Sequence, residues 1–242
     1  MQAIIMAAGK GSRLGELTAG NPKSFVEIQG KKLIDYNLKL LEKYGVDEII
    51  IVTGYRCEAF EELLRDKKNI KFVYNPFYEM VNVLASFYMG MYLLEDDFIY
   101  LHADTICEPE IFDKLVQMDA DVVLPVDYKI CDDEAMKVRS ENGQVVQITK
   151  QMPNESAEGE FIGIAAFRKR VIPALKEKTK QLMKEKAFSA YFESAIQRLI
   201  DEETFDIRTV PTDGAFWAEV DFMEDYERAT AEIPDSLTGI FV

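Results

Sequence analysis

The sequence predicts an α/β protein with a Rossmann-like, mostly parallel mixed sheet flanked by helices. Short runs at 3–8, 48–52 and 98–101 are apolar at nearly every position, which is typical of parallel strands buried on both faces. Segments with helical spacing lie between these runs, and this alternation indicates right-handed βαβ units. The chain has 242 residues, 48% of them hydrophobic, which is enough for the core of one domain.

The first half of the chain follows this alternation in order. Expected strands cover 3–8, 48–52, 70–74, 98–101 and 121–126. Expected helices cover 33–44, 57–65, 83–94 and 108–117, and the first of them stops at Gly45. The carboxyl ends of parallel strands meet at one edge of a sheet, and open α/β sheets bind their ligands there.

The second half is richer in β-structure. Segments 137–139 and 145–149 flank the sequence ENG and predict a hairpin, and 159–167 predicts one further strand. Helices are expected at 172–186 and 188–201, a strand at 207–210, and a last helix from Met223 after the segment WAEVD. Because no linker interrupts the pattern, residues 1–242 are expected to form a single domain.

Composition excludes several classes of protein. The formal net charge of −15 argues against nucleic-acid binding, which needs clustered Lys and Arg. The three cysteines are far apart and show no metal-binding spacing, as expected for reduced residues of a cytoplasmic protein. The apolar run 3–8 is too short for a signal peptide or a membrane span, so no membrane association is expected.

The stretch AAGKGSRLGELTAGNPKSF directly follows the first strand. Gly9 and Gly11 let the backbone approach a ligand closely, and successive N–H groups there can hold an anion. The spacing is neither that of a P-loop nor a clean GxGxxG, so a simple tight turn is the alternative. The order of Arg13, Thr18, Pro22 and Lys23 behind the glycines is more specific than the glycines themselves.

From Ala7 through Lys23 the sequence resembles the signature of the sugar-phosphate nucleotidyltransferase superfamily, roughly AAGxGSRLxxLTxxxPKxx. The resemblance implies the nucleotidyltransferase fold, which is GT-A-like. It implies that Arg13 contacts the leaving pyrophosphate and Lys23 the α-phosphate and the incoming oxygen. It also places the backbone of the opening loop around the nucleotide, through Ala7, Ala8, Gly9, Gly11 and Ser12.

Charge repulsion explains why such a loop needs cations. The reaction brings an anionic oxygen against a nucleotide phosphate, and two unit charges about 4 Å apart repel by roughly 4 kcal/mol at an effective dielectric near 20. An arginine offers a planar fork for pyrophosphate, and a lysine offers a point charge.

Two acidic segments are candidates for a Mg²⁺ site. The segment FIYLHADT delivers Asp104 to the carboxyl edge, and WAEVD supplies Glu219 and Asp221. Mg²⁺ is usually held by one or two carboxylates together with substrate phosphates. The resemblance implies that Asp104 and Asp221 hold it; Glu219 either joins them or only orients them. His102, the single histidine, alternates with Asp104 and could face the site or be a packed strand residue; packing is favoured, since this chemistry needs no histidine base.

The middle of the chain resembles the phosphocholine and 2-aminoethylphosphonate cytidylyltransferase-like branch of this superfamily. Asn82 and Ser86 match positions near the base and ribose in that branch, and Gly54 with Tyr55 in VTGY matches positions that flank the base. Val83 departs from the pattern, because the phosphocholine enzymes carry a second asparagine there, and this leaves the acceptor undecided.

Three residues are candidates for binding the acceptor. Lys150 matches a lysine that contacts the acceptor phosphate in relatives, with an exposed surface lysine as the alternative. Trp217 could bind an amine by cation–π attraction, with Glu160 as counter-charge, or could equally be a core aromatic.

The resemblance therefore implies a Mg²⁺-dependent cytidylyltransferase. CTP and a small phosphorylated or phosphonylated amino-alcohol, of the phosphocholine or 2-aminoethylphosphonate type, would yield a CMP-containing product and pyrophosphate. Residues 1–126 would form the nucleotide-binding core, 127–222 the acceptor-binding part, and 223–242 a C-terminal helix and tail. The alternatives are a sugar-1-phosphate nucleotidyltransferase and a non-catalytic nucleotide-sensing subunit. A homodimer stays open.

Overall fold

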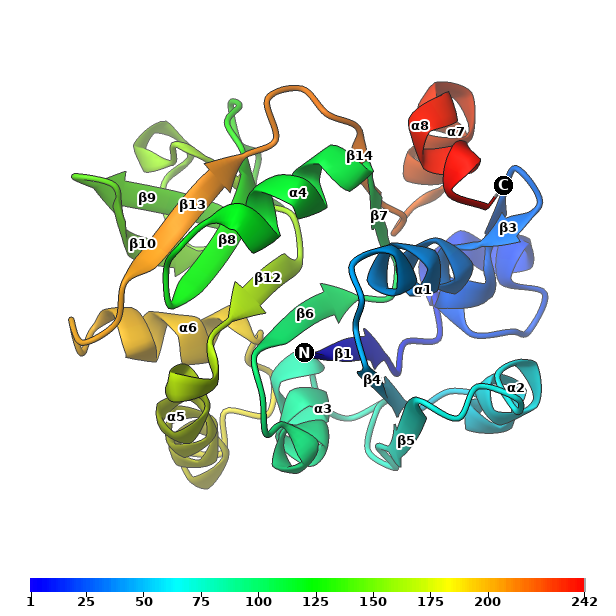
Figure 1. The fold of residues 1–242 in the computed structure, drawn as a ribbon, viewed down its shortest axis with the longest axis horizontal. Helices are drawn as coiled ribbons and strands as arrows, with labels where there is room; N and C mark the ends of the chain where they lie inside the picture. The colour runs from blue at the N-terminus through cyan, green and yellow to red at the C-terminus, as the bar shows by residue number, and fades with distance from the viewer. Residues whose placement is uncertain (242) are drawn as a thin grey trace.

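Four parallel strands form the half of the central sheet that contains the N-terminus (Figure 1). The computed structural model describes residues 1–241. In sheet order the parallel strands are β5 (Ile70–Tyr74), β4 (Glu48–Thr53), β1 (Gln2–Ala7) and β6 (Phe98–His102). All six residues of β1 are buried, as expected for a strand covered on both faces. The expected parallel α/β arrangement is confirmed.

Alternate residues of β1 point into two separate cores. Ile4 and Met6 pack with α3 (Val83–Gly90), whereas Ala3, Ile5 and Ala7 pack against the opposite layer. That opposite layer contains α1 (Leu33–Lys43), α2 (Cys57–Leu63) and α4 (Pro109–Gln117). Because successive side chains of a strand point to opposite faces, one apolar strand supports both helix layers.

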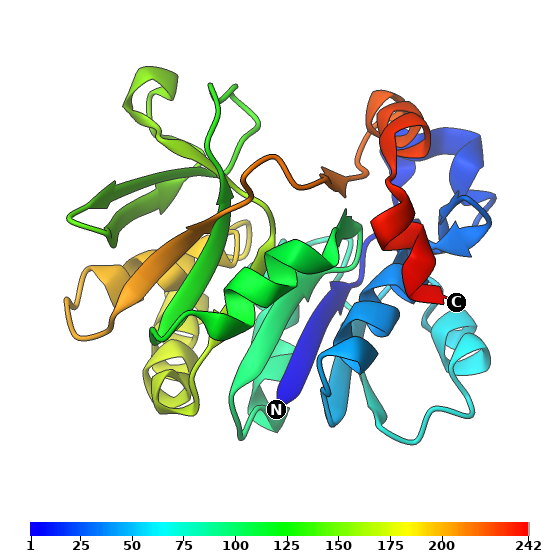
Figure 2. The ribbon, with the colours of Figure 1, turned by 45° about the horizontal axis from the view of Figure 1, so that its top comes forward.

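The other half of the sheet is mainly antiparallel and continues from β6 without a break (Figure 2). From β6 outward it contains β12 (Ile164–Phe167), β8 (Val122–Asp127), β11 (Gly159–Phe161), β9 (Lys137–Glu141) and β10 (Gln144–Thr149). One further strand, β13 (Ile207–Pro211), pairs with β8 in parallel. The expected hairpin is confirmed as β9 and β10, and Asn142 and Gly143 turn it with positive φ angles.

The single strand expected at 159–167 is two strands. The chain breaks at Gly163, which has φ +78°, so that β11 pairs with β8 and β9 while β12 pairs with β6 and β8. A continuous apolar run carries no signal for such a change of partner, apart from the glycine itself.

Two helices are shorter than expected. The helix predicted at 188–201 begins only at Glu193, as α6 (Glu193–Ile200), and 83–94 is α3 followed by a 3₁₀ turn at Met91–Leu93. The backbone carbonyls of Phe188 and Ala190 instead accept hydrogen bonds from the backbone N–H groups of Asn82 and Leu84, respectively. The remaining long helix, α5 (Ile172–Lys184), ends two residues before the expected boundary.

Two short strand pairs were not predicted from the sequence. β14 (Trp217–Glu219) pairs antiparallel with β7 (Thr105–Cys107), so that Glu219 lies opposite Thr105. A small hairpin of β2 (Glu27–Ile28) and β3 (Lys31–Lys32) follows the opening loop. The first pairing fixes the late acidic segment beside the residues that follow β6.

The C-terminal segment packs on its own domain. α7 (Met223–Glu232) begins at the expected residue, and α8 (Asp235–Thr238) follows. Leu237 is fully buried, and the ring of Phe241 meets that of Tyr36 edge-on at 5.0 Å. In the described part of the chain, no helix has the length and apolar character needed to cross a bilayer.

Phe192 should contribute strongly to stability. Its fully buried ring stacks on Tyr100 with the centroids 3.9 Å apart, and lies 4.5 Å from Phe87. We expect Phe192→Ala to lower the free energy of unfolding by about 3–5 kcal/mol in urea denaturation, because the cavity cannot collapse completely. Phe188→Ala is the matched control: that side chain is 46% exposed, and its removal should change stability by less than about 0.5 kcal/mol. Equal losses in the two variants would contradict this packing.

Candidate active site

A cleft of about 400 Å³ opens at the carboxyl ends of β1 and β6. The strand order reverses at this point, because β4 follows β1 on one side of the sheet while β6 joins on the other. The lining includes eleven of the residues predicted from the sequence: Ala8, Gly9, Gly11, Ser12, Arg13, Lys23, Asn82, Ser86, Asp104, Glu219 and Asp221. Segments far apart in the chain therefore meet in one hollow.

The opening loop folds back over Lys23. Gly11 has φ +69°, and a Cβ atom at this position would lie 2.9 Å from the side chain of Lys23. Both facts require a glycine there. The backbone N–H of Lys23 donates to the carbonyl of Gly9 at 3.4 Å, and the residue is only 8% exposed. The loop thus holds one lysine against the end of β1.

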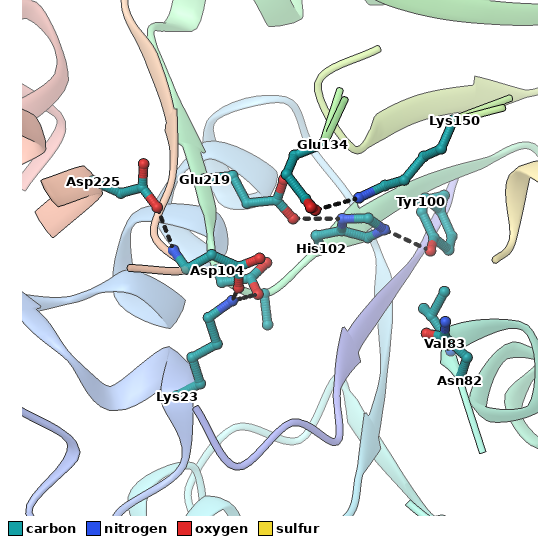
Figure 3. A network of polar contacts seen from close by, with 12 residues as sticks. Lys23, Asn82, Val83, Tyr100, His102, Asp104, Glu134, Lys150, Glu219 and Asp225 are labelled. Atoms are coloured by element: carbon teal, nitrogen blue, oxygen red, sulfur yellow. Dashed lines mark hydrogen bonds and ion pairs between the residues drawn. The ribbon is translucent and has the colours of Figure 1, made fainter. Parts of the chain in front are cut away.

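The ammonium of Lys23 lies between Asp104 and Asp221 and donates a hydrogen bond to each. Figure 3 shows its contact with Asp104. Burial by itself lowers the pKa of Lys23, but the charges of Asp104, Asp221 and Glu219 outweigh it and raise that pKa above its usual value. For Asp104 the effect of burial has the opposite sign and raises the pKa, but the charge of Lys23 outweighs burial and lowers that pKa. The lysine is therefore cationic and Asp104 is ionised at neutral pH.

Arg13 stands at the rim of the same cleft. One of its terminal nitrogens lies 3.6 Å from Asp221, and its guanidinium lies 4.9 Å from the centre of the Phe222 ring. The side chain remains 59% exposed. Arg13 is thus positioned beside the carboxylates with most of its donors directed to solvent.

The carboxylates fit a divalent cation. The Oδ1 atom of Asp104 is buried and has no hydrogen-bond partner among the described residues. The backbone N–H of Val220 donates to the Asp104 carbonyl at 3.0 Å, and that of Asp221 donates to Asp225 at 3.0 Å, so both segments are held in place. Buried carboxylate oxygens without partners are suitable ligands for Mg²⁺. Asp104, Asp221 and Glu219 are the residues that would hold it.

His102 lies in β6 and packs against Tyr100, but it also faces the site, so the favoured interpretation as a packed strand residue is incomplete. Its ring lines the cleft, with Nδ1 3.4 Å from Glu219 and Nε2 3.0 Å from the hydroxyl of Tyr100. Burial lowers the pKa of His102, but the hydrogen bond and charge of Glu219 raise it more, to about 9. Gly163, where the predicted strand breaks, gives the ring its space, and that break was not foreseen.

Of the residues predicted to bind the nucleoside, some line the cleft and others lie behind the residues that line it. The amide of Asn82 donates to the carbonyl of Ser189, and the Ser86 hydroxyl accepts from Asn75 at 2.9 Å. Gly54 and Tyr55 lie behind the lining. A Cβ atom on Gly54 would lie 2.7 Å from the side chain of Tyr78 and 2.8 Å from the carbonyl of Ala8. Ala7 is buried in the core below Ala8.

None of the three predicted acceptor residues lines the cleft as the described residues define it. Glu160 pairs with Lys129 at 2.7 Å, and the same ammonium lies 4.9 Å from the centre of the Trp217 ring. The indole N–H of Trp217 donates to Asp127 at 3.2 Å. The ammonium of Lys150 lies over the Tyr191 ring and 3.5 Å from Glu134. Their acceptor roles stay predictions.

Two tyrosines of the cleft were missed. Tyr78 and Tyr191 both line it from loops, beside α3 and just before α6. Neither lies in a strand or helix, so no periodicity marked them; the only sequence signal was the aromatic content of the surrounding stretches.

The comparisons with known proteins agree with this geometry. The sequence model of the MobA-like NTP transferase domain matches residues 3–195. The chain is 27% identical to a CTP:phosphoglutamine cytidylyltransferase of Campylobacter jejuni, over 94% of this chain and 98% of that protein. It is 28% identical to a choline-phosphate cytidylyltransferase of Haemophilus influenzae, over 93% of this chain and 94% of the relative.

A solved structure shares the fold along nearly the whole chain. The CTP:phosphocholine cytidylyltransferase from Streptococcus pneumoniae superposes with a TM-score of 0.80 at 23% identity, covering 96% of this chain and 99% of that one. A similarity of this kind establishes a common backbone arrangement, including the long mixed sheet.

Lys23 should be needed to hold the carboxylates together. We expect Lys23→Gln to lower the free energy of unfolding by about 3 kcal/mol at neutral pH. This is the lower end of the range for breaking a buried ion pair, and it is chosen because the side chain of Asp221 is partly exposed. Without Lys23 the pKa of Asp104 rises, so the deficit should shrink as the pH falls and the carboxylates become protonated. Chemical denaturation from pH 7 down to pH 4 measures this; Lys10→Gln, at an exposed lysine of the same loop, is the control. A deficit that does not depend on pH would contradict the assignment.

Proposed function

Because the chain belongs to the MobA-like NTP transferase domain family, we propose that it is a CTP-dependent cytidylyltransferase. The acceptor is a small phosphorylated or phosphonylated amino-alcohol, and the second product is pyrophosphate. Relatives that span nearly the whole chain support the nucleotide and the transfer reaction, since both are named cytidylyltransferases.

One observation carries the proposal: cations and carboxylates converge at the strand-order reversal of a strongly acidic chain. The net charge of −15 would repel a nucleotide triphosphate, yet Arg13 and Lys23 face the cleft there. The glycine loop closes over Lys23, and Arg13 remains 59% exposed at the rim of the cleft, so its donors are open to a ligand. Local cations can overcome net charge at a binding site.

Each residue then has a distinct part in the reaction. The loop from Ala8 to Ser12 presents backbone N–H groups to the triphosphate. Arg13 binds the pyrophosphate as it leaves, and Lys23 neutralises the α-phosphate as charge develops on it. The acceptor oxygen attacks the α-phosphorus in line and displaces pyrophosphate. Its phosphate or phosphonate is already ionised at neutral pH, so no general base is needed, and positioning supplies much of the rate.

Mg²⁺ is the proposed cofactor, with Asp104, Asp221 and Glu219 as its protein ligands. When bound, it neutralises charge on the reacting phosphates. Lys23 lies between Asp104 and Asp221, and we propose that its ammonium turns toward the α-phosphate when substrate binds. Asn82 and Ser86, with Gly54 and Tyr55 behind them, form the side of the cleft proposed for cytosine and ribose.

The acceptor's amine is proposed to lie beyond Glu219, toward Trp217 and Glu160. The ammonium of Lys129 lies against both groups, and this supports their capacity to hold a cation. A relative named CMP-5'-(3-aminopropyl)phosphonate synthase, from Streptomyces rubellomurinus, is 25% identical over 95% of this chain, although this chain covers only 38% of that protein. Lys150 is proposed for the acceptor phosphate.

Pyrophosphate release across a panel of substrates tests the reaction. The four NTPs are combined with phosphocholine, 2-aminoethylphosphonate, phosphoethanolamine and a set of sugar 1-phosphates, each with Mg²⁺. We expect turnover with CTP and an amine-bearing acceptor. Turnover with sugar phosphates alone would instead identify a sugar-1-phosphate nucleotidyltransferase, and no turnover in any combination would favour a nucleotide-sensing protein.

Asp221 should be essential to turnover but not to the fold. We expect Asp221→Asn to lower kcat by about 100-fold or more, the usual cost of losing a preorganised electrostatic partner of the transition state. Asp66→Asn is the matched control, because Asp66 is exposed and precedes β5 at the opposite end of the sheet. Thermal unfolding checks that both variants fold; normal turnover in Asp221→Asn would refute the metal assignment.

A further inference from the structure

We infer that His102 contributes Nδ1 as a ligand to the divalent cation held by Asp104 and Glu219, so that this site takes Mn²⁺ or Co²⁺ more readily than Mg²⁺. The inference rests on the proposed function, because it concerns the same cleft. It adds a nitrogen donor to a set of ligands otherwise made of oxygen. The three side chains come from β6, from the turn after it, and from β14, which the β7–β14 pairing brings alongside.

The donor atoms are close enough to share one ion. One potential ligand atom from each of His102, Asp104 and Glu219 lies within 4.8 Å of the others. His102 Nδ1 and the Glu219 carboxylate are 3.4 Å apart. Neighbouring ligands of an octahedral ion with bonds of about 2.1 Å are about 3 Å apart, so a small movement of either side chain suffices.

The other ring nitrogen, Nε2, has a hydrogen-bond partner, as the second nitrogen of a metal-binding histidine usually does. Nε2 lies 3.0 Å from the hydroxyl of Tyr100, which is fully buried. The Tyr100 ring is fixed in turn by stacking on Phe192. When a cation displaces the proton from Nδ1, a hydrogen bond from Nε2–H to this hydroxyl keeps the tautomer whose Nδ1 lone pair faces the ion.

The backbone around the ring leaves Nδ1 accessible. The N–H of His102 donates to the carbonyl of Gly163 at 3.0 Å, and a Cβ atom on Gly163 would lie only 2.7 Å from Nδ1. Any other residue at 163 would therefore cover the nitrogen. On the far side, the partnerless Oδ1 of Asp104 offers a second donor.

The preference of the site among metal ions distinguishes ligation by His102 from a simple ion pair between His102 and Glu219. An imidazolium that only pairs with Glu219 leaves the cation with carboxylates, and hard Mg²⁺ suits such a site. Imidazole ligation instead favours divalent transition-metal ions over Mg²⁺, and within that series the affinity of a site with nitrogen and oxygen ligands rises from Mn²⁺ to Co²⁺.

Spin-echo modulation of bound Mn²⁺ gives a direct test, because the chain contains a single histidine. The untagged full-length protein is loaded with Mn²⁺ alone, without CTP, whose base would add nitrogen. We expect ¹⁴N modulation typical of coordinated imidazole, converted to the ¹⁵N pattern when only histidine is labelled. Mn²⁺ bound without nitrogen modulation would overturn the inference, as would a failure of the nucleotide-free chain to bind Mn²⁺.

Two variants separate ligation from packing. Loss of even an outer hydrogen-bond partner costs about 10–100-fold in metal affinity, so His102→Gln should lose the nitrogen signal and weaken Mn²⁺ binding by at least about tenfold, with less effect on Mg²⁺. Tyr100→Phe keeps the ring and the ligand; it should retain the signal while Mn²⁺ binds more weakly. Equal Mn²⁺ affinity in wild type and His102→Gln, with both folded by circular dichroism, would refute ligation.

These measurements are independent of the substrate panel. If Mn²⁺ shows the histidine signal but no NTP is turned over, the metal site stands and the proposed reaction fails. If CTP is turned over but the bound Mn²⁺ shows no nitrogen, the reaction stands and His102 is only a partner of Glu219.

Discussion

The arrangement of the cleft depends on one ammonium group, that of Lys23. Lys23 lies between two carboxylates that the chain supplies 81 and 198 residues further on, and each segment reaches it by a different structural route. Asp104 lies just after β6, and Asp221 is placed by the pairing of β14 with β7. The glycine loop closes over Lys23. Without a cation there, three carboxylates would face one another in a partly buried cleft, which is costly unless a proton or metal replaces it.

The long mixed sheet explains how so acidic a chain can form a site for anions. Its parallel half brings the opening loop and the end of β6 to one edge, while its antiparallel half supplies the wall that carries Glu160 and its partner Lys129. Arg13 and Lys23 are thus placed where the strand order reverses, although the chain as a whole is strongly acidic. The nearby carboxylates hold Lys23 protonated, so the cation remains available as substrate exchanges.

In and beside the cleft, several side chains pair with one another. The ammonium of Lys129 lies over the Trp217 ring, that of Lys150 lies over the Tyr191 ring, and His102 Nδ1 contacts Glu219. Each of these contacts pairs groups that a substrate or an ion would also seek. This common feature connects the acceptor proposal with the inference about His102.

The sequence alone determined the alternating strands and helices, the glycine loop, and the residues that meet around Lys23. The strands, the helices and the loop follow from short-range periodicity and from the side-chain sizes that a close turn permits, and both can be read along the chain. The residues around Lys23 were predicted from the resemblance of the opening loop and of the two acidic segments to a known superfamily. Only the tertiary structure decided the role of His102, whose partner is 117 residues away, and the lysine that covers Trp217. Period-two alternation places His102 and Asp104 on one side of the chain, but it cannot reveal which distant strand lies opposite. The break at Gly163 and the pairing of β7 with β14 settle that question, because contacts across a sheet depend on strand order and register rather than on local pattern.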